Sequence, residues 1–266
     1  MDAEDFSKLA LHRPLSSMFV HLLMSELCST AIWPESGASL ANGLDDLANR
    51  SLDSFDELTR PDVLRAAMRA SALFGKGDGW QLQPQCDLAG HDGVEQFTRM
   101  LYGRFGEDLS APYDSSDQRS PDSLGLYEPE LARPGPRRSL VQHSSKWSLS
   151  WDSSISQELE AEYFGQFEQF STPAGAVLEV ADCADWVALI AANPMHLGAV
   201  PAHYGVRGSR RKRLLIPHWG RIAQSYSGVH ITWTAFLLSE GALLDIGDIG
   251  FGLMRFQRSE RTFWLT

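Results

Sequence analysis

The chain has 266 residues and a formal net charge of −11, with 34 acidic against 23 basic side chains. A strong negative charge repels phosphate backbones and anionic lipid headgroups, so a general nucleic-acid-binding protein and a basic membrane-surface protein are both disfavoured. Apolar residues make up 43% of the chain, which is enough to bury a sizeable core.

The cysteines and the first residues predict where the protein resides. The three cysteines, Cys28, Cys86 and Cys183, lie far apart and form no CxxC pair, which is typical of a reducing compartment and predicts no zinc site. The N-terminus is acidic and lacks the positive start of a secretory signal. The apolar run over residues 18–24 is too short to span a bilayer. We therefore expect a cytoplasmic protein outside the membrane.

Helical periodicity dominates the N-terminal part of the chain. Residues 4–33 are predicted to be helical, with a break or a fresh start at Pro14, because proline lacks an amide hydrogen and clashes with the preceding turn. A second helix is predicted over residues 61–74, with a proline in its first turn and a glycine after its end. A third helix is predicted over residues 94–105.

The composition changes over residues 110–138, where serine, aspartate, proline and glycine predominate. Such a segment cannot bury enough apolar surface to order itself. We therefore predict three parts, namely a mainly helical region over residues 1–109, a linker over residues 110–138 and a mixed α+β domain over residues 139–266.

Short strands alternate with helices beyond the linker. Strands are predicted at residues 140–141, 147–151, 176–180, 214–216, 229–233 and 262–265. Helices are predicted at residues 158–170, 219–226 and 235–244, and after the N-cap Asp182 as far as Pro194. The expected fold is therefore α+β, with a helical N-terminal part followed by a mixed, mainly antiparallel, short-stranded sheet with helices.

A basic cluster is the first candidate site. Five of the seven residues 207–213 are cationic in an otherwise acidic chain. Guanidinium groups match phosphate oxygens in pairs, so Arg210 and Arg211 are candidates for binding a phosphorylated ligand. The alternative is a solvated loop that balances nearby acidic surface, and a charge run on its own favours this alternative.

The second candidate site lies on the predicted strand 229–233. His230 and Thr232 alternate with apolar residues, so we expect both on one side of the strand. If that side lines a cleft near Trp219, His230 can act as a general base or bind a ribose hydroxyl, and Thr232 can orient it. If that side faces solvent, both are ordinary surface residues.

The chain from residue 177 to residue 265 resembles a group of uncharacterised bacterial proteins. Its segments V-L-E-V, I-P-H-W, G-V-H-I-T and F-W-L correspond to V-Y-E-I, I-P-D-W, Y-D-G-V-H-L-T and W-W-L in that group. His218 and Ser227 stand where the group favours aspartate.

That group is in turn similar to the split-sheet fold of NAD-consuming ADP-ribosyltransferase-like domains. The resemblance implies a first Arg or His, a second element of serine or tyrosine and a final glutamate. His143 stands for the first element, Ser148 or Ser150 for the second and Glu240 for the last. Because Glu240 precedes a glycine, the alternative for it is a surface residue at a helix end.

Transfer of a ribosyl group from NAD also needs a cation for the pyrophosphate and an aromatic ring that stacks on nicotinamide. Arg210 or Arg211 supplies the first and Trp219 or Tyr226 the second. No metal is expected, and nucleic acid is not an expected partner.

Two functions remain open at this point. The first is an intracellular protein that binds a nucleotide or another phosphorylated small molecule, as an ADP-ribosyltransferase-like enzyme consuming NAD. The second is a non-catalytic interaction or regulatory protein with a protein partner. Six of the eight tryptophans follow Lys146. In an interaction or regulatory protein, these aromatic residues would form a core and a partner-binding surface.

Overall fold

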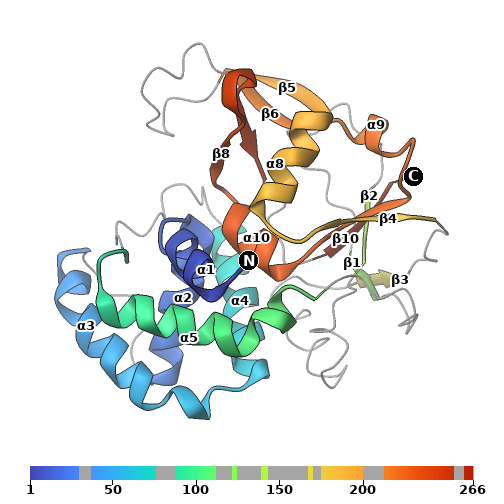
Figure 1. Cartoon of the computed structure of the whole chain (residues 1–266). Coiled ribbons are helices and arrows are strands. Elements are labelled where there is room, and N and C mark those ends of the chain that lie inside the picture. The colour runs from blue at the N-terminus through green and yellow to red at the C-terminus, as the bar shows by residue number, and fades with distance from the viewer. Residues whose placement is uncertain are drawn as a thin grey trace. The chain divides into compact units, whose positions relative to one another are not determined.

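The structure is a computed structural model in which the described residues are 1–29, 37–75, 88–111, 122–124, 139–142, 167–169, 175–199, 213–254 and 261–265. They form two compact units, one within Met1–Leu109 and one from Ser110 onwards. The first is helical and the second combines strands with helices (Figure 1), which confirms the predicted α+β class.

The N-terminal unit is built from α-helices and one 3₁₀ turn. These are α1 (Ala3–Ala10), α2 (Pro14–Leu27), α3 (Gly37–Asp53), η1 (Phe55–Glu57), α4 (Arg60–Gly75) and α5 (Asp92–Leu109). The predicted fresh start at Pro14 is confirmed, because α1 ends before it and α2 begins on it. Every side chain of α2 from Leu15 to Ser25 is buried, so this helix is enclosed on all sides.

Side chains of α1 and α2 fix the N-terminal end of this unit. The ring of Phe6 on α1 stacks on that of Tyr102 on α5, with centroids 4.2 Å apart. The Ser16 hydroxyl donates to the Ala10 carbonyl at 2.7 Å, and the Ser17 hydroxyl donates to the Leu11 carbonyl at 2.9 Å. These two bonds satisfy carbonyls at the end of α1, where no further helical turn follows.

Helix α3 was not predicted from the sequence. Its described buried residues are Leu44, Leu47, Ala48 and Ser51, which recur at helical spacing. Glycines and asparagines at other positions of α3 lower its helix propensity. The helix therefore depends on packing against the neighbouring helices.

The C-terminal unit contains two sheets among its described strands, rather than the single sheet that we predicted. The first consists of β1 (Asp122–Leu124), β2 (Ser139–Gln142), β3 (Phe167–Gln169), β4 (Val177–Val180), β7 (Gly228–Ile231) and β10 (Arg261–Leu265), in the order β3-β1-β2-β10-β7-β4. The second consists of β5 (Pro194–Ala199), β6 (Arg213–Pro217), β8 (Leu243–Asp245) and β9 (Phe251–Leu253), in the order β5-β6-β9-β8. The predicted antiparallel majority is confirmed, since only β4–β7 and β6–β9 are parallel among the described strand pairs.

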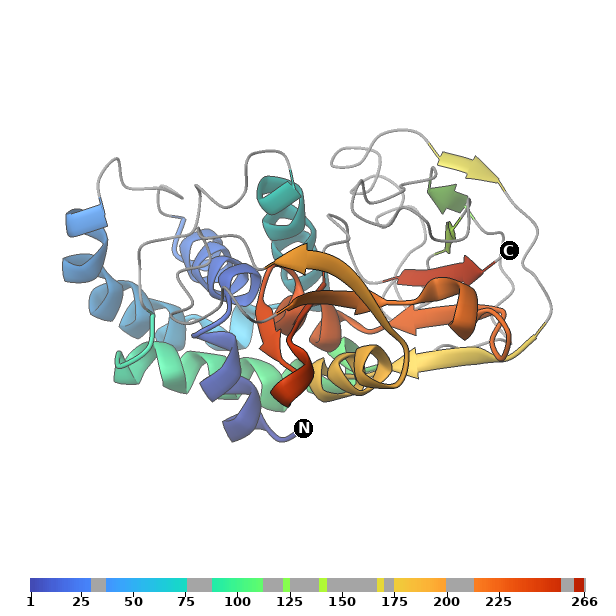
Figure 2. The same cartoon turned by 90° about the horizontal axis from the view of Figure 1, so that it is seen from above.

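Short helices connect and cover these strands. They are α8 (Cys183–Ala192), α9 (Trp219–Ile222), α10 (Trp233–Ser239) and the 3₁₀ turn η4 (Gly247–Ile249). The predicted N-cap is confirmed, because the Asp182 carboxylate accepts from the amides of Ala184 at 2.8 Å and Asp185 at 3.0 Å. Helix α8 contacts α10 and lies alongside β5 and β6, as Figure 1 and Figure 2 show.

Several predicted elements are wrong in part where the structure describes them. The helix predicted over residues 235–244 is one, because α10 ends at Ser239 and strand β8 begins at Leu243. The strand predicted over residues 229–233 ends at Ile231, and Trp233 already belongs to α10. The helix predicted over residues 158–170 contains strand β3 at Phe167–Gln169, and its residues 158–166 lie outside the described part. The strand predicted at residues 147–151 also lies outside it, as does most of the predicted linker, within which β1 is described.

The ion pair between Glu4 on α1 and Arg99 on α5 leads to a prediction about pH dependence. Arg99 donates to the Glu4 carboxylate at 3.1 Å, and this bond, followed by the contact with Lys8, lowers the pKa of Glu4. A lowered folded-state pKa stabilises the fold above the unfolded pKa, and this contribution is lost as the pH falls through the folded value. We expect Arg99→Gln to raise the pKa of Glu4 towards its ordinary value in an NMR pH titration. Arg50→Gln, which removes an exposed ion pair with Asp46 on α3, should leave that pKa unchanged.

Candidate functional site

A histidine and a glutamate meet on the two parallel strands of the first sheet. Glu179 on β4 is in register with His230 on β7. The His230 Nδ1 atom lies 2.5 Å from Glu179 Oε1, and because a carboxylate only accepts, Nδ1 is the donor. The imidazole is fully buried, whereas 33% of the Glu179 side chain is exposed. The buried ring therefore orients a carboxylate that solvent and ligands can reach.

The backbone register extends this pair into a row of polar residue types. His230 is opposite Thr262 of β10, and Thr262 is opposite Gln142 of β2. The adjacent row of Leu178, Val229, Phe263 and Val141 is apolar. The sequence alternates in phase on these four strands, so a polar row and an apolar row cross the sheet next to each other.

Thr232 caps a helix instead of continuing strand β7. It is the N-cap of α10, and its hydroxyl accepts from the Ala235 amide at 3.1 Å and donates to the Ala181 carbonyl at 2.9 Å. Its own amide donates to the Val180 carbonyl at 3.1 Å. The prediction that Thr232 continues the strand beside His230 is therefore wrong. Its hydroxyl instead joins the end of β4 to the start of α10.

Trp219 also belongs to the core. Its indole is 8% exposed and lies against that of Trp186 on α8, with ring centroids 6.1 Å apart. The preceding residue, His218, donates its backbone amide to the Asn193 carbonyl at 2.7 Å, which fixes the corner between β6 and α9. An indole buried in this way offers little surface for stacking on a nicotinamide ring.

Glu240 is buried, so the interpretation of this residue as a surface group at a helix end is wrong. It is the C-cap of α10 and only 1% exposed, and its amide donates to the Phe236 carbonyl at 2.9 Å. Its backbone also pairs with Met254 in an isolated parallel bridge. The side chain of Glu240 is therefore inaccessible to a ligand in this structure. Tyr226, by contrast, is half-buried in the turn that precedes β7.

The basic cluster and the N-terminal site residue are only partly described. Arg210, Arg211 and His143 lie outside the described residues. Arg213 is exposed at the start of β6, in register with Ala199, and its Nη1 atom is 3.5 Å from His196 Nε2. The four residue steps from Arg213 to the other end of β6 span about 13 Å. Arg213 thus lies a full strand length from the corner at His218 and Trp219.

Glu179 is the site residue that the sequence analysis missed. It was placed correctly on a strand, but no role was assigned to it, because one acidic residue on a short strand has many surface interpretations. The usable signal was a pair of short runs, V-L-E-V and G-V-H-I, that each place one titratable residue at the third position. Parallel pairing of these runs brings the two side chains together.

The described ranges hold neither a metal-ligand cluster nor a membrane-spanning helix. There, no group of three or more histidine, cysteine, aspartate or glutamate side chains is placed to hold a metal ion. No helix of the same ranges has both the length and the apolar character that are needed to cross a bilayer. Cys28 and Cys183 are each half-buried, and Cys28 Sγ lies 3.2 Å from the Ser51 hydroxyl.

The Thr232 hydroxyl both caps α10 and donates to the Ala181 carbonyl, so we expect its removal to destabilise the fold. Thr232→Val keeps the branched shape but removes the cap of α10 and deprives the partly buried Ala181 carbonyl of the Thr232 hydroxyl donor. We expect the free energy of unfolding to fall by about 2 kcal/mol. Thr232→Ser keeps the hydroxyl and should lose much less. Urea denaturation of the two variants and the wild type measures both effects, and equal stability of Thr232→Val and Thr232→Ser would contradict the assignment.

Comparison with known proteins gives no match. Neither protein-family models, nor curated sequences, nor solved structures are similar to this chain at the significance required.

Proposed function

We propose that the C-terminal unit binds a phosphorylated ligand and consumes NAD as an ADP-ribosyltransferase-like enzyme, with Glu179 as its reactive carboxylate. The observation that carries the proposal is the contact between the fully buried His230 ring and the partly exposed Glu179 side chain. A carboxylate held in one orientation by a buried donor is a preorganised group, which is the property that electrostatic catalysis requires.

The choice of Glu179 over Glu240 follows from exposure. A carboxylate that stabilises a developing oxocarbenium ion must contact the ribose. Glu240 is 1% exposed, whereas a third of the Glu179 side chain is open to solvent. Glu179 also lies in the V-L-E-V segment on which the family resemblance rests. It therefore replaces Glu240 as the final glutamate in our proposal.

The proposed reaction breaks the bond between the nicotinamide nitrogen and the ribose carbon of NAD. The bonding electron pair leaves with nicotinamide, which becomes neutral, and the positive charge that develops on the ribose lies against the Glu179 carboxylate. A lone pair of water or of a nucleophilic acceptor then forms the new bond to that carbon, and the acceptor proton passes to solvent or to the carboxylate. In this scheme His230 is a positioning residue, because it acts through Glu179.

Arg210 and Arg211 are retained in the proposal as the cations for the pyrophosphate, and Tyr226 as the aromatic ring. The two arginines are proposed from the sequence alone. Tyr226 is half-buried just before β7, the strand that carries His230, so the residue is partly open to solvent. Trp219 is no longer proposed as a ligand contact because of its burial against Trp186.

The direct test is release of nicotinamide from NAD by the purified chain. We expect release by the wild type, and a loss of about 100-fold or more in Glu179→Gln, because the substitution keeps the shape and removes the charge. His230→Asn should reduce the rate less, since it loosens the carboxylate without removing it. Asp248→Asn removes an exposed carboxylate from η4 in the same unit and should leave the rate unchanged.

Two results would contradict the proposal that the protein is an NAD-consuming enzyme. One is the absence of nicotinamide release by the wild-type chain, and the other is an unchanged rate in Glu179→Gln. A melting curve for each variant shows whether it is folded, so that a lost fold is not mistaken for a lost catalytic group.

A non-catalytic interaction or regulatory protein is the second candidate, and one observation favours it. Four residues that the sequence assigned to a site, namely Trp219, His230, Thr232 and Glu240, are buried, and all of them except His230 contribute to packing or capping. Melting curves with NAD, ADP-ribose and inorganic phosphate separate the two candidates, because a ligand of the folded state raises the melting temperature. No shift with any of them, together with no nicotinamide release, would favour the second candidate.

A further inference from the structure

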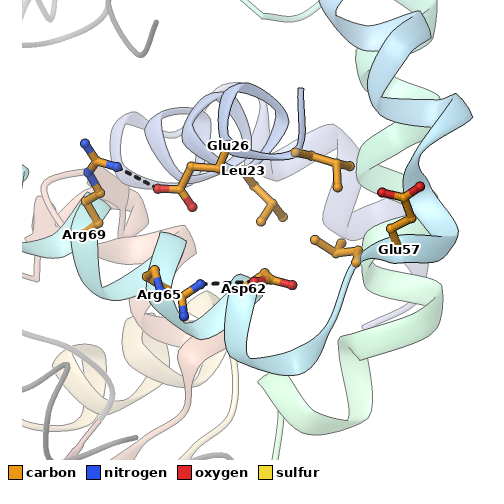
Figure 3. A pocket seen from close by; sticks show the side chains of 8 residues that line it. Leu23, Glu26, Glu57, Asp62, Arg65 and Arg69 are labelled. Carbon is orange, nitrogen blue, oxygen red and sulfur yellow. Dashed lines mark hydrogen bonds and ion pairs between the residues drawn. The ribbon is translucent and has the colours of Figure 1, made fainter. Parts of the chain in front are cut away.

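A hollow in the N-terminal unit lies between α2 and α4 and has a volume of about 470 Å³. This volume is within the range of small-molecule sites. The half-buried Leu27 and the almost fully buried Leu23 and Leu58 form its apolar floor, and charged side chains complete its wall. Figure 3 shows the labelled arginines towards one end of this hollow and Glu57 towards the other.

Two arginines on α4, one helical turn apart, supply hydrogen-bond donors to the hollow. Arg69 Nη1 donates to Glu26 Oε1 at 2.8 Å, and Arg65 Nη1 donates to Asp62 Oδ1 at 3.1 Å. A guanidinium carries five N–H donors, and in the described part of the chain each of these two uses a single nitrogen for its bond. Donors therefore remain on both groups, in the paired geometry that suits a carboxylate.

Glu57 supplies the opposite charge. It ends the 3₁₀ turn η1 and is exposed, and among the described residues no cation is paired with it. The Asp62 carboxylate differs, because it already accepts from the Thr59 amide at 3.0 Å and from Arg65. Glu57 is thus the carboxylate best able to receive a cationic group.

The mixture of charges restricts the class of ligand. A phosphate or another compact anion would meet three carboxylates, on Glu26, Glu57 and Asp62, as well as the two arginines. A simple cation would meet the arginines. A molecule with one charge of each sign, separated by an aliphatic body, avoids both repulsions and places its apolar part over the leucines.

We propose that this hollow binds an elongated zwitterion. Its carboxylate is received by Arg65 and Arg69 and its ammonium group by Glu57. Its aliphatic body lies against the half-buried Leu27, above the buried Leu23 and Leu58. An ω-amino acid and a short apolar peptide share this chemistry. The proposal is independent of NAD consumption, since all of its residues belong to the N-terminal unit.

The test is an NMR titration of the whole ¹⁵N-labelled chain with 6-aminohexanoate and, in a second arm, with the dipeptide Leu-Leu. We expect saturable shifts of amides in η1 and α4. Hexanoate, which lacks the ammonium group, should bind about fivefold more weakly than 6-aminohexanoate, as expected for the loss of one exposed charge pair. Tighter binding of Leu-Leu than of 6-aminohexanoate would identify the ligand as a peptide, and the reverse order would identify an ω-amino acid.

Substitutions assign the two ends of the ligand. Glu57→Gln should weaken 6-aminohexanoate about fivefold and should not weaken hexanoate, because only the former carries an ammonium group. Arg65→Gln should weaken both probes. Asp56→Asn is the matched control, since Asp56 is an exposed neighbour in η1 that does not line the hollow. The absence of saturable shifts with both 6-aminohexanoate and Leu-Leu overturns the proposal, as does an equal loss in Glu57→Gln and Asp56→Asn.

Discussion

The parallel pairing of β4 with β7 is the constraint on which the C-terminal unit depends. Both strands run directly into a helix, and the Thr232 backbone amide and hydroxyl bind the Val180 and Ala181 carbonyls at that point. A shift of one residue in this register would move every side chain of one strand to the opposite face of the sheet. It would break the contact between Glu179 and His230. The fold and the candidate site therefore depend on the same alignment.

Much of the fold could be predicted from local patterns, and the failures have physical reasons. The β4 strand and the Asp182 cap were predicted because alternation and a capping carboxylate are local signals. The end of β7 was misplaced because Thr232 and Trp233 continue the alternation by type, although Thr232 caps a helix. Helix α10 is buried throughout, so it shows no amphipathic period that would have marked its start.

The candidate site was less predictable than the fold, because it depends on pairing between distant segments. His230 was identified as a candidate, but its partner lies 51 residues earlier in the chain. The sequence offered Glu240 as a reactive carboxylate, although the apolar residues on both sides of it are typical of a buried segment. Trp219 illustrates the same difficulty, since an aromatic beside a proline and a histidine suits a binding site and a core equally well. Tertiary packing decides between these interpretations, and one sequence does not encode it locally.

The enclosure of α2 has a consequence for how this protein can vary. Eleven consecutive side chains, from Leu15 to Ser25, are covered by neighbouring atoms, so this stretch has no outward position at which a polar or bulky replacement would be neutral. Accepted changes there must conserve volume, and a change in one residue must be compensated by its neighbours. Fluorescent labels, crosslinkers and affinity tags therefore belong elsewhere on the chain, and divergence in this segment should proceed through coupled exchanges.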